Sequence, residues 1–343
     1  MSLISIYTDI LKEHGADFDI IYMDKYGEEE EISAKNKYVF VNIIDSSKPR
    51  IIKAFQYLKF RRFAIPLLEK NKYDFIIVWN DVAIIMFADY LSKKWKNKYC
   101  LNIRDYGQQK VKWIYNRFSK VIKNSSFTTI SSEGFRSFLP EHEYVQIHSL
   151  NLSVLKNADI RTSLREKNKP IRIAFIGNIR FFEMNQKLLE LFKNDDRFQL
   201  CFFGTNANQL ETYAKENAIR NVQFHDTFPV KDTHLFLQET DLINNLYGNN
   251  SIALKYALSI KLYHGLYLRM PILVNNDTWG EQIVNKYGTG FVMHEMNTDF
   301  KEKLYSWYTS LDFSTFNNGC ENYLRKAKHD NQVFESIMIK MIE

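Results

Sequence analysis

The sequence predicts an α/β protein built from two parallel-sheet domains in series. Apolar, strand-like runs alternate with helix-like segments along most of the 343 residues, which is the pattern of parallel sheets with helical crossovers. The alternation stops after Ser149 and resumes at Ile171. A chain of this length can also bury two separate cores. We therefore expect two α/β domains whose parallel sheets face one another across a cleft.

The domain boundaries follow from the place where the alternation stops. The expected first domain covers residues 1–155, a linker covers 156–170, and the second domain covers 171–315. The last residues, 316–343, are predicted to form a helix that packs back toward the first domain.

The first domain opens with a helix before its first strand, whereas an α/β domain usually opens with a strand. Either the sequence is trimmed or the edge of this sheet is unusual. The long helix over 49–72 contains Pro66, which we expect to kink or divide it because proline lacks the N–H of a helix interior. The expected elements are helices over 4–14, 49–72, 82–98 and 108–123, and strands over 18–23, 38–43, 74–79, 99–103 and 127–130.

The second domain repeats the alternation with short buried strands. Its expected strands cover 171–176, 200–203, 222–225, 242–246 and 272–274, with a last short strand after Gly290. Helices are expected over 181–193, 206–217 and 230–238, from Ser259, from Thr278, and along the tail from Phe300.

Composition narrows the class of protein. The chain is 45% hydrophobic and 25% charged, as globular proteins are. It contains no run of the roughly 18–20 apolar residues that a membrane span needs, and its start does not resemble a signal peptide. Cys100, Cys201 and Cys320 are far apart and form no CxxC pair. We therefore expect a cytoplasmic protein with buried thiols, without a metal site and without a resident cofactor.

One stretch, from Asn249 to Val274, organises the second domain. Ser259 is placed to cap a helix, and Lys261 adds a positive charge to the first turn. The start of a helix offers free N–H groups and a positive dipole, which suit a phosphate or diphosphate. The alternative is an amphipathic helix before a core strand, with a solvated lysine.

Two glycines follow core strands of the same domain. Gly177-Asn178-Ile179-Arg180 directly follows the strand 171–176, and Arg180 can hold a diphosphate through its forked guanidinium. Gly204-Thr205 follows the next strand. Each is open to the alternative of a plain strand-to-helix turn. Together they let Arg180 and Lys261 converge on one diphosphate.

Polar clusters also follow two strands of the first domain. Arg104-Asp105 comes after one strand, where a carboxylate can orient a sugar hydroxyl or act as a base. Its alternative is a salt-bridged loop pair. Ser131-Ser132-Glu133 comes after the next strand, and its alternative is a helix cap with an acidic first turn.

The net charge of +6 is carried by clustered basic residues. Between Lys53 and Phe63, cationic and aromatic side chains alternate on one predicted helix, which suits an anionic membrane surface. The alternative is a solvated helix whose aromatic side chains belong to the core. No nucleic-acid-binding module accompanies the basic residues, so we do not expect a nucleic-acid partner.

The order of these motifs resembles retaining GT-B glycosyltransferases of the family 4 type, which act in bacterial capsule and exopolysaccharide assembly. The resemblance extends from about Asp74 to Met293. It is carried by YDFIIVWNDVAIIMFADYLSKKWKNKYCLNIRDY and FTTISSEGFRSFL in the first half, and by IRIAFIGNIR, LCFFGTN, VQFHDTFPVKDTHLFLQETDLINNLYG, SIKLYHGLYLRMPILV and GTGFVM in the second.

The resemblance implies a GT-B fold of two Rossmann-like domains and transfer of a sugar from a nucleotide-diphosphate sugar, with a UDP-sugar as the expected donor. The acceptor would be a glycan or a lipid-linked oligosaccharide at the inner face of the plasma membrane. Asp105, Arg180 and Lys261 would serve catalysis. The donor residues would be Gly177, Asn178, Arg180, Gly204, Thr205, Thr227, Ser259, Ile260, Lys261, Leu262 and His264; the acceptor side would comprise Arg104, Asp105, Ser131, Ser132 and Glu133.

This sequence departs from the family at three places. The paired glutamates of the family are absent: the second falls on His264 and the earlier one near Tyr256. The N-terminal strand with its Gly-rich loop is missing, and Arg104 stands where the family often has histidine. Two other functions therefore stay open, a catalytically inactive GT-B-like partner in a polysaccharide-assembly complex and a sugar-nucleotide epimerase.

Overall fold

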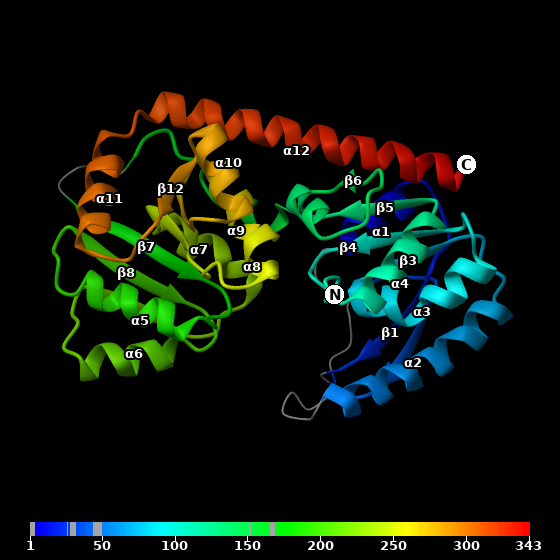
Figure 1. The fold of residues 1–343 in the computed structure, drawn as a ribbon. Coiled ribbons are helices and arrows are strands. Elements are labelled where there is room, and N and C mark those ends of the chain that lie inside the picture. The colour runs from blue at the N-terminus through cyan, green and yellow to red at the C-terminus, as the bar shows by residue number, and fades with distance from the viewer. Residues whose placement is uncertain (1–3, 26, 28–31, 44–49, 151, 165–168) are drawn as a thin grey trace. The chain divides into compact units, whose positions relative to one another are not determined.

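The computed structural model describes residues 4–25, 27, 32–43, 50–150, 152–164 and 169–343 (Figure 1). The chain divides into two compact units, each described by itself below. Unit 1 consists of Met1–Ile147 and Asp330–Glu343, and unit 2 consists of His148–His329. The expected linker, 156–170, thus falls within unit 2, because Leu155 already belongs to the core of that unit.

Unit 2 is built on one sheet of six parallel strands. The strand order is β12-β11-β10-β7-β8-β9. The strands are β7 (Ile171–Ile176), β8 (Phe198–Phe203), β9 (Val222–His225), β10 (Leu242–Asn245), β11 (Ile272–Asn275) and β12 (Gly290–Met293). The strands are nearly continuous apolar runs, as expected for a sheet that is covered on both faces.

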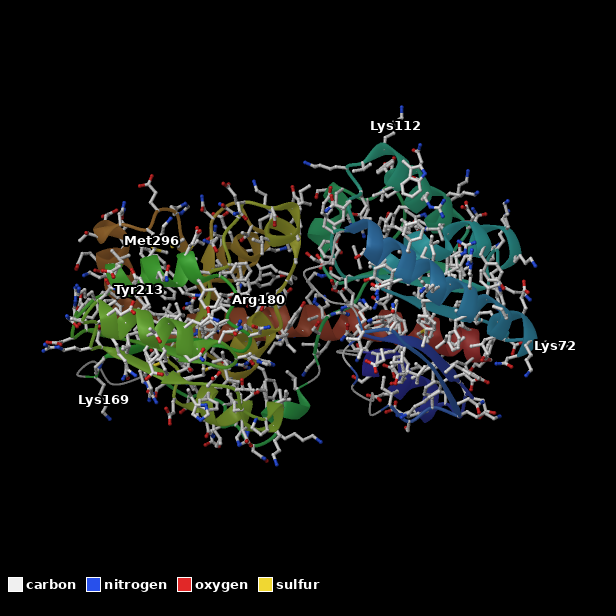
Figure 2. The ribbon with its side chains drawn as sticks, turned by 90° about the horizontal axis from the view of Figure 1, so that it is seen from below. Lys72, Lys112, Lys169, Arg180, Tyr213 and Met296 are labelled. Atoms are coloured by element: carbon white, nitrogen blue, oxygen red, sulfur yellow. The ribbon has the colours of Figure 1, made fainter. Side chains whose placement is uncertain are left out.

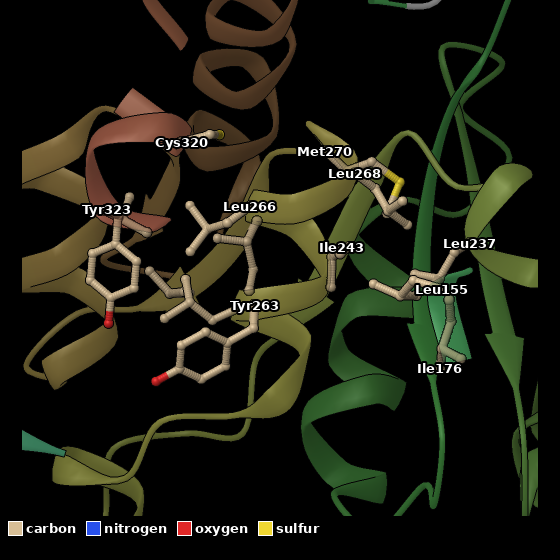
Figure 3. Packing of buried hydrophobic residues seen from close by; sticks show 14 of the residues in the cluster. Leu155, Ile176, Leu237, Ile243, Tyr263, Leu266, Leu268, Met270, Cys320 and Tyr323 are labelled. Atoms are coloured by element: carbon tan, nitrogen blue, oxygen red, sulfur yellow. The ribbon is translucent and has the colours of Figure 1, made fainter. Parts of the chain in front are cut away.

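Helices and their cores cover both faces of this sheet. One core joins α9 and the first part of α12 to the sheet and includes Tyr263, Leu266 and Tyr323 (Figure 3). A second core includes Phe175, Phe192 and Phe202. The helices are α5 (Phe182–Leu191), α6 (Ala207–Glu216), α7 (Thr233–Gln238), α8 (Ile252–Tyr256), α9 (Ile260–Leu268), α10 (Trp279–Tyr287), α11 (Thr298–Ser310) and α12 (Phe313–Ile342).

The strand order of unit 2 reverses between β7 and β10. From β7 the chain adds β8 and β9 on one side, and it then returns to add β10, β11 and β12 on the other. Open α/β sheets bind ligands at such a reversal, beyond the carboxyl ends of the strands, which here are β7 and β10.

Unit 1 has the same kind of architecture but two separate sheets. One is a four-stranded parallel sheet of order β3-β4-β5-β6, and the other is the parallel pair β1-β2. The strands are β1 (Asp19–Asp24), β2 (Asn36–Val41), β3 (Ile76–Trp79), β4 (Tyr99–Ile103), β5 (Phe127–Ile130) and β6 (Val145–Gln146). The helices are α1 (Ser5–Glu13), α2 (Arg50–Lys70), α3 (Asp81–Lys94) and α4 (Lys112–Lys123).

The end of α12 belongs to unit 1. Phe334 and Met338 pack with Tyr7 of α1, Cys100 of β4 and Phe127 of β5. The earlier part of the same helix, with Phe316 and Cys320, packs in unit 2 instead. The expected C-terminal helix is therefore present, and it takes part in one core at each end.

The predicted fold class is confirmed, since both units are α/β with parallel sheets. Two local expectations differ. The helix α2 runs without interruption from Arg50 to Lys70, so Pro66 does not divide it. A short helix, α8, occupies part of the predicted loop before Ser259, because Ser251 caps it by accepting a hydrogen bond from the Leu254 N–H at 3.3 Å.

Candidate functional site

Gly177 lies directly beyond β7, at the reversal point of unit 2. Its φ of 119° is a conformation that side chains rarely adopt, and no atom lies within 4 Å of the place where a Cβ would be. Its N–H is used by the sheet, donating to the Phe203 carbonyl at 2.8 Å. The space above Gly177 is therefore open to a ligand, as the ligand-binding interpretation requires.

Gly204 is a glycine for a different reason. It also has a positive φ, 134°, but a Cβ there would lie 2.1 Å from the carbonyl oxygen of Gly177. The two strand ends approach each other so closely that a side chain cannot be placed between them. Close backbone packing alone thus accounts for Gly204, which is the structural alternative considered for it.

Lys261 lies in the first turn of α9, where Ser259 is the N-cap. The Ser259 hydroxyl accepts a hydrogen bond from the Lys261 N–H at 3.2 Å, as predicted. The Lys261 side chain is buried, with 8% of its surface exposed. Its Nζ donates to the Tyr247 hydroxyl and lies 3.8 Å from the centre of the Phe175 ring. The lysine is thus fixed between two aromatic rings rather than mobile in solvent.

Burial governs the charge of this lysine. Desolvation lowers the pKa of Lys261, and the nearby positive charge of Arg180 lowers it further, while Tyr247 acts in the opposite direction. An anion placed beside Arg180 and Lys261 would favour the charged form of Lys261, because an opposite charge favours ionisation.

Arg180 extends from the loop after β7 and is exposed (Figure 2). Its guanidinium carbon lies 5.9 Å from the centre of the Phe181 ring, and that ring lies 4.9 Å from Tyr247. Arg180, Lys261 and the open backbone of Gly177 are therefore gathered around the end of β7. Tyr247 completes the group, and the sequence interpretation missed it; its position directly after the strand 242–246 was the available signal.

His264 lies one turn after Lys261 on α9 and is buried, with 7% of its surface exposed. Its Nε2 has no hydrogen-bond partner. Burial, and secondarily the charge of Lys261, lower the pKa of His264 to about 4. The imidazole is therefore neutral at pH 7, and it cannot supply the negative charge that a glutamate would supply there.

A second polar group is formed by residues that follow β7, β8 and β9. The Thr227 hydroxyl lies 3.2 Å from that of Thr205, and the Asn206 amide lies 3.2 Å from the Asn178 side-chain oxygen. All four belong to loops beyond the carboxyl ends of strands. Two further predicted donor residues, Ile260 and Leu262, are apolar and do not belong to this polar group. Leu262 is a core residue with 2% of its surface exposed, whereas Ile260 is exposed.

In unit 1, two carboxylates meet beyond β3 and β4. Asp81 is the first residue of α3, and its Oδ1 is buried without a hydrogen-bond partner. Burial, and then the charge of Asp105, raise the pKa of Asp81 to about 8. The cap of this helix is Asn80, whose side chain accepts a hydrogen bond from the Ala83 N–H at 3.0 Å.

The other predicted acceptor residues are held by local contacts. Ser132 is fully buried and caps a 3-10 turn by accepting a hydrogen bond from the Gly134 N–H at 3.2 Å. Glu133 forms an ion pair with Arg136 at 2.7 Å. Ser131 is hydrogen-bonded to the Arg104 carbonyl at 3.5 Å, and the Arg104 guanidinium lies 5.7 Å from the centre of the Trp79 ring. This segment fits the cap alternative.

The basic-aromatic helix α2 has an exposed face and a core face. Phe60 is buried, whereas Phe55 and Leu58 are 63% and 51% exposed. Lys53 lies outside the side chains that the structure describes. Helix α4 adds a second exposed apolar group that the sequence interpretation had not assigned: Trp113, 61% exposed, lies beside the exposed Lys112 (Figure 2).

Within the described residues, no helix combines the length and the apolar character that a membrane span requires. Among the same residues, no three His, Cys, Asp or Glu side chains lie together as a metal site would need. The three cysteines are free and buried.

Comparison with known proteins identifies the fold. No model of a protein family matches the sequence, and no curated protein matches it. Solved structures do match, at low identity. Sucrose-phosphate synthase from Thermosynechococcus elongatus superimposes with a TM-score of 0.67 at 11% identity, over 98% of this chain and 90% of that one.

Two further structures agree with the first. A glycosyltransferase from Rickettsia africae gives a TM-score of 0.63 at 14% identity, over 99% of this chain and 94% of that one. HepE from Anabaena, solved in complex with UDP, gives 0.60 at 10% identity, over 88% and 86%. The chain therefore has the GT-B fold of glycosyltransferases, as the sequence resemblance predicted.

Proposed function

We propose that the protein is a glycosyltransferase that moves a sugar from a nucleotide-diphosphate sugar to a glycan or lipid-linked acceptor. One observation carries the proposal: Arg180 and Lys261 gather beside the open backbone of Gly177, at the reversal point of a GT-B sheet. Cations at this point of a doubly wound sheet suit a diphosphate.

In this proposal, unit 2 binds the donor. The leaving diphosphate gains negative charge as the bond to the sugar breaks, and Arg180 and Lys261 stabilise that charge. Because Lys261 is held by Tyr247 and Phe175, it is already in position before the reaction. Such preorganised cations act without a metal ion, so we propose a metal-independent enzyme that needs no cofactor.

Unit 1 would bind the acceptor. Asp105, which is exposed beyond β4, would orient a hydroxyl group of the acceptor. If the configuration of the sugar is retained, the leaving phosphate takes the acceptor proton and no strong base is required. The neighbouring Asp81 is protonated at pH 7 and would donate a hydrogen bond rather than accept a proton.

The finer parts of the proposal come from the sequence resemblance. They are a UDP-sugar as donor, retention of configuration, and a role in capsular or exopolysaccharide biosynthesis. A fold neighbour solved with UDP supports the choice of UDP as the first nucleotide to test.

Nucleotide binding tests the proposal. Calorimetry with UDP, GDP and dTDP, followed by transfer assays with the matching nucleotide-sugars, should identify one nucleotide that binds. Replacing Lys261→Met, which keeps the length of the side chain without its charge, should lower turnover about 100- to 1,000-fold. Arg180→Ala should have a comparable effect.

The matched control is Lys286→Met, which removes an exposed lysine that also lies beside an aromatic ring, 5.4 Å from the centre of Tyr287. This variant should behave as the wild type. Unchanged turnover in Lys261→Met would refute the role assigned to Lys261, and the absence of binding by every nucleotide would refute the proposal.

His264 favours a second candidate function, a non-catalytic partner with the same fold. The buried, neutral histidine stands where the resembled family has a glutamate. A partner of this kind would bind neither nucleotide nor nucleotide-sugar, so the same calorimetry separates the two functions.

We also propose that the protein works at the inner face of the plasma membrane. The exposed Phe55, Leu58 and Trp113, with basic residues beside them, suit an anionic interface. Sedimentation with phosphatidylcholine vesicles, with and without phosphatidylserine, measures this binding. Trp113→Ala should weaken it about fivefold, whereas Val230→Ala, at an apolar position of unit 2 that is 71% exposed, should not. Equal binding to vesicles with and without phosphatidylserine would contradict this proposal.

A further inference from the structure

Unit 1 contains a cavity of about 1650 Å³ between its two sheets. All six residues of β1, from Asp19 to Asp24, line it on one side. Ile76, Ile77 and Trp79 of β3 line it as well. Among the described residues β1 pairs only with β2, and β3 pairs only with β4, so each is an edge strand on the side of the cavity (Figure 1).

Helices complete the walls of this cavity. Tyr7 and Leu11 of α1 and Met338 of α12 line it, as do Phe60 of α2 and Phe87 of α3. Apolar side chains predominate around it, and polar or charged ones such as Asp19, Asp24 and Asn80 line it as well. Two strand edges with helices packed around them form the environment that surrounds an inner strand of a doubly wound sheet.

Unit 2 shows which strand fills this position. There β7 lies between β8 and β10, and it leads through α5 into β8. In unit 1, α1 leads into β1 just as α5 leads into β8. The order β2-β1, then the cavity, then β3-β4-β5 therefore matches β9-β8-β7-β10-β11-β12, with the cavity in the place of β7 and with β6 as one additional strand.

The chemistry of an occupant follows from this correspondence. The strand β7 has the sequence IRIAFI, and five of its six side chains are buried. A strand of that length extends about 20 Å, the length of β1. The exposed N–H and C=O groups of two parallel edges bind a peptide backbone, and the apolar walls bind its side chains.

We infer that unit 1 binds an extended peptide segment, apolar on both faces, as a parallel strand between β1 and β3. The added strand joins the two-stranded and four-stranded sheets into one. Every strand among the described residues already lies in a sheet, so none of these strands fills the position. The occupant that we propose is a segment of a second polypeptide. This inference is independent of nucleotide binding, because the nucleotide residues belong to unit 2.

A peptide copied from β7 tests the inference. The probe is a fluorescein-labelled IRIAFI peptide with two lysines added for solubility, and its control is IRIPFI, because the central proline removes a backbone donor. With the full-length protein, fluorescence anisotropy should show binding at least tenfold tighter for IRIAFI. Hydrogen exchange should slow at least tenfold in both β1 and β3, and remain unchanged in the outer strands β9 and β12.

Several outcomes would overturn the inference. In the anisotropy experiment, the contrary outcome is equal binding of the two peptides. In the exchange experiment, the contrary outcomes are slower exchange in only one of β1 and β3, or equally slow exchange in β9 and β12. Slower exchange that arises from self-association of the protein without peptide would also contradict the inference. If the cavity binds an apolar small molecule instead of a peptide, hydrogen exchange in β1 and β3 stays unchanged, and this result would also overturn the inference.

Two variants locate the binding. Ile21→Glu places a charge on β1 inside the cavity and should weaken IRIAFI binding at least tenfold. Val39→Glu, on β2 and 37% exposed, is the control and should bind as the wild type. If Ile21→Glu does not fold, the exchange experiment on the wild type decides alone.

Discussion

Unit 2 places two cations beyond the carboxyl ends of its strands, whereas unit 1 places two carboxylates there. In unit 2, Arg180 lies close enough to Lys261 to lower its pKa, and the backbone of Gly177, in the same loop as Arg180, is open. In unit 1, Asp81 and Asp105 meet instead, and one of them is protonated at pH 7. The same α/β architecture thus supplies a place for a ligand, and the residues at the strand ends decide its chemistry.

The units also differ in how close their strand ends come. The backbones of Gly177 and Gly204 nearly touch in unit 2, while in unit 1 the position after β3 is Asn80, which carries a side chain at a φ of 75°. The six strands of unit 2 form one sheet, and those of unit 1 form two. Variants at these positions measure how much each difference contributes to the free energy of unfolding.

The largest effect is expected at Gly204. Gly204→Ala forces a Cβ against the Gly177 carbonyl and adds an unfavourable φ, so it should lower the free energy of unfolding by about 4 kcal/mol. Gly177→Ala, with open space around it, should cost only about 2 kcal/mol. Asn80→Gly should lower the free energy of unfolding by only a few tenths of a kcal/mol, because glycine is also a good N-cap. Urea unfolding measures all three, and equal losses at Gly177 and Gly204 would contradict the close approach.

The next effect concerns the carboxylate pair of unit 1. The pKa of Asp81 rises from 3.8 to about 8 on folding, so the unfolded chain releases this proton first as the pH rises. Stability due to the protonated Asp81 is therefore present below pH 4 and is lost between pH 4 and pH 8. Asp81→Asn should be more stable than the wild type by up to about 4 kcal/mol at pH 7, and nearly equal at pH 4.

Urea unfolding at several pH values checks this expectation. Asp105→Asn should reduce the same pH dependence, because it removes the charge that acts on Asp81. If the pH dependence of stability is the same for the wild type and Asp81→Asn from pH 4 to pH 8, the pKa of Asp81 is not raised on folding.

The smallest effect has the opposite sign and belongs to unit 2. The pKa of His264 falls from 6.5 to about 4 on folding, so the unfolded chain takes up the proton first as the pH falls. Stability is complete above pH 6.5 and is lost toward pH 4, by about 2 kcal/mol at pH 5. His264→Gln should remove this loss in an acid unfolding series. His294→Gln, at an exposed histidine, should keep it; if it does not, the loss has another origin.

The sequence predicts much of the fold because strands and helices depend on local patterns. Ser259 is recognisable as a cap, and the apolar runs show where strands lie. The environment of Lys261 is not predictable in this way. Its partners, Tyr247 and Phe175, come from two other strand ends, and only the strand order brings them together.

The same reason explains what was missed in unit 1. Asp81 follows β3 and Asp105 follows β4, and their interaction depends on the pairing of Trp79 with Asn102. From the sequence alone Asp81 is one more acidic residue at the start of a helix. The helix α1 before β1, by contrast, is predictable from the sequence, because its apolar residues recur at helical spacing.

The helix α12 has a consequence for the order in which the protein is made. The core of unit 1 includes Phe334 and Met338, which a ribosome adds only after it has added residues 148–329 of unit 2. Domains generally fold as units during synthesis, at about 5–20 residues per second. The first unit to be translated therefore waits about 10–40 s, while unit 2 is synthesised, for the side chains that complete its own core. Unit 2 holds nearly all of its core residues before unit 1 does, so the second half of the chain is expected to finish folding first.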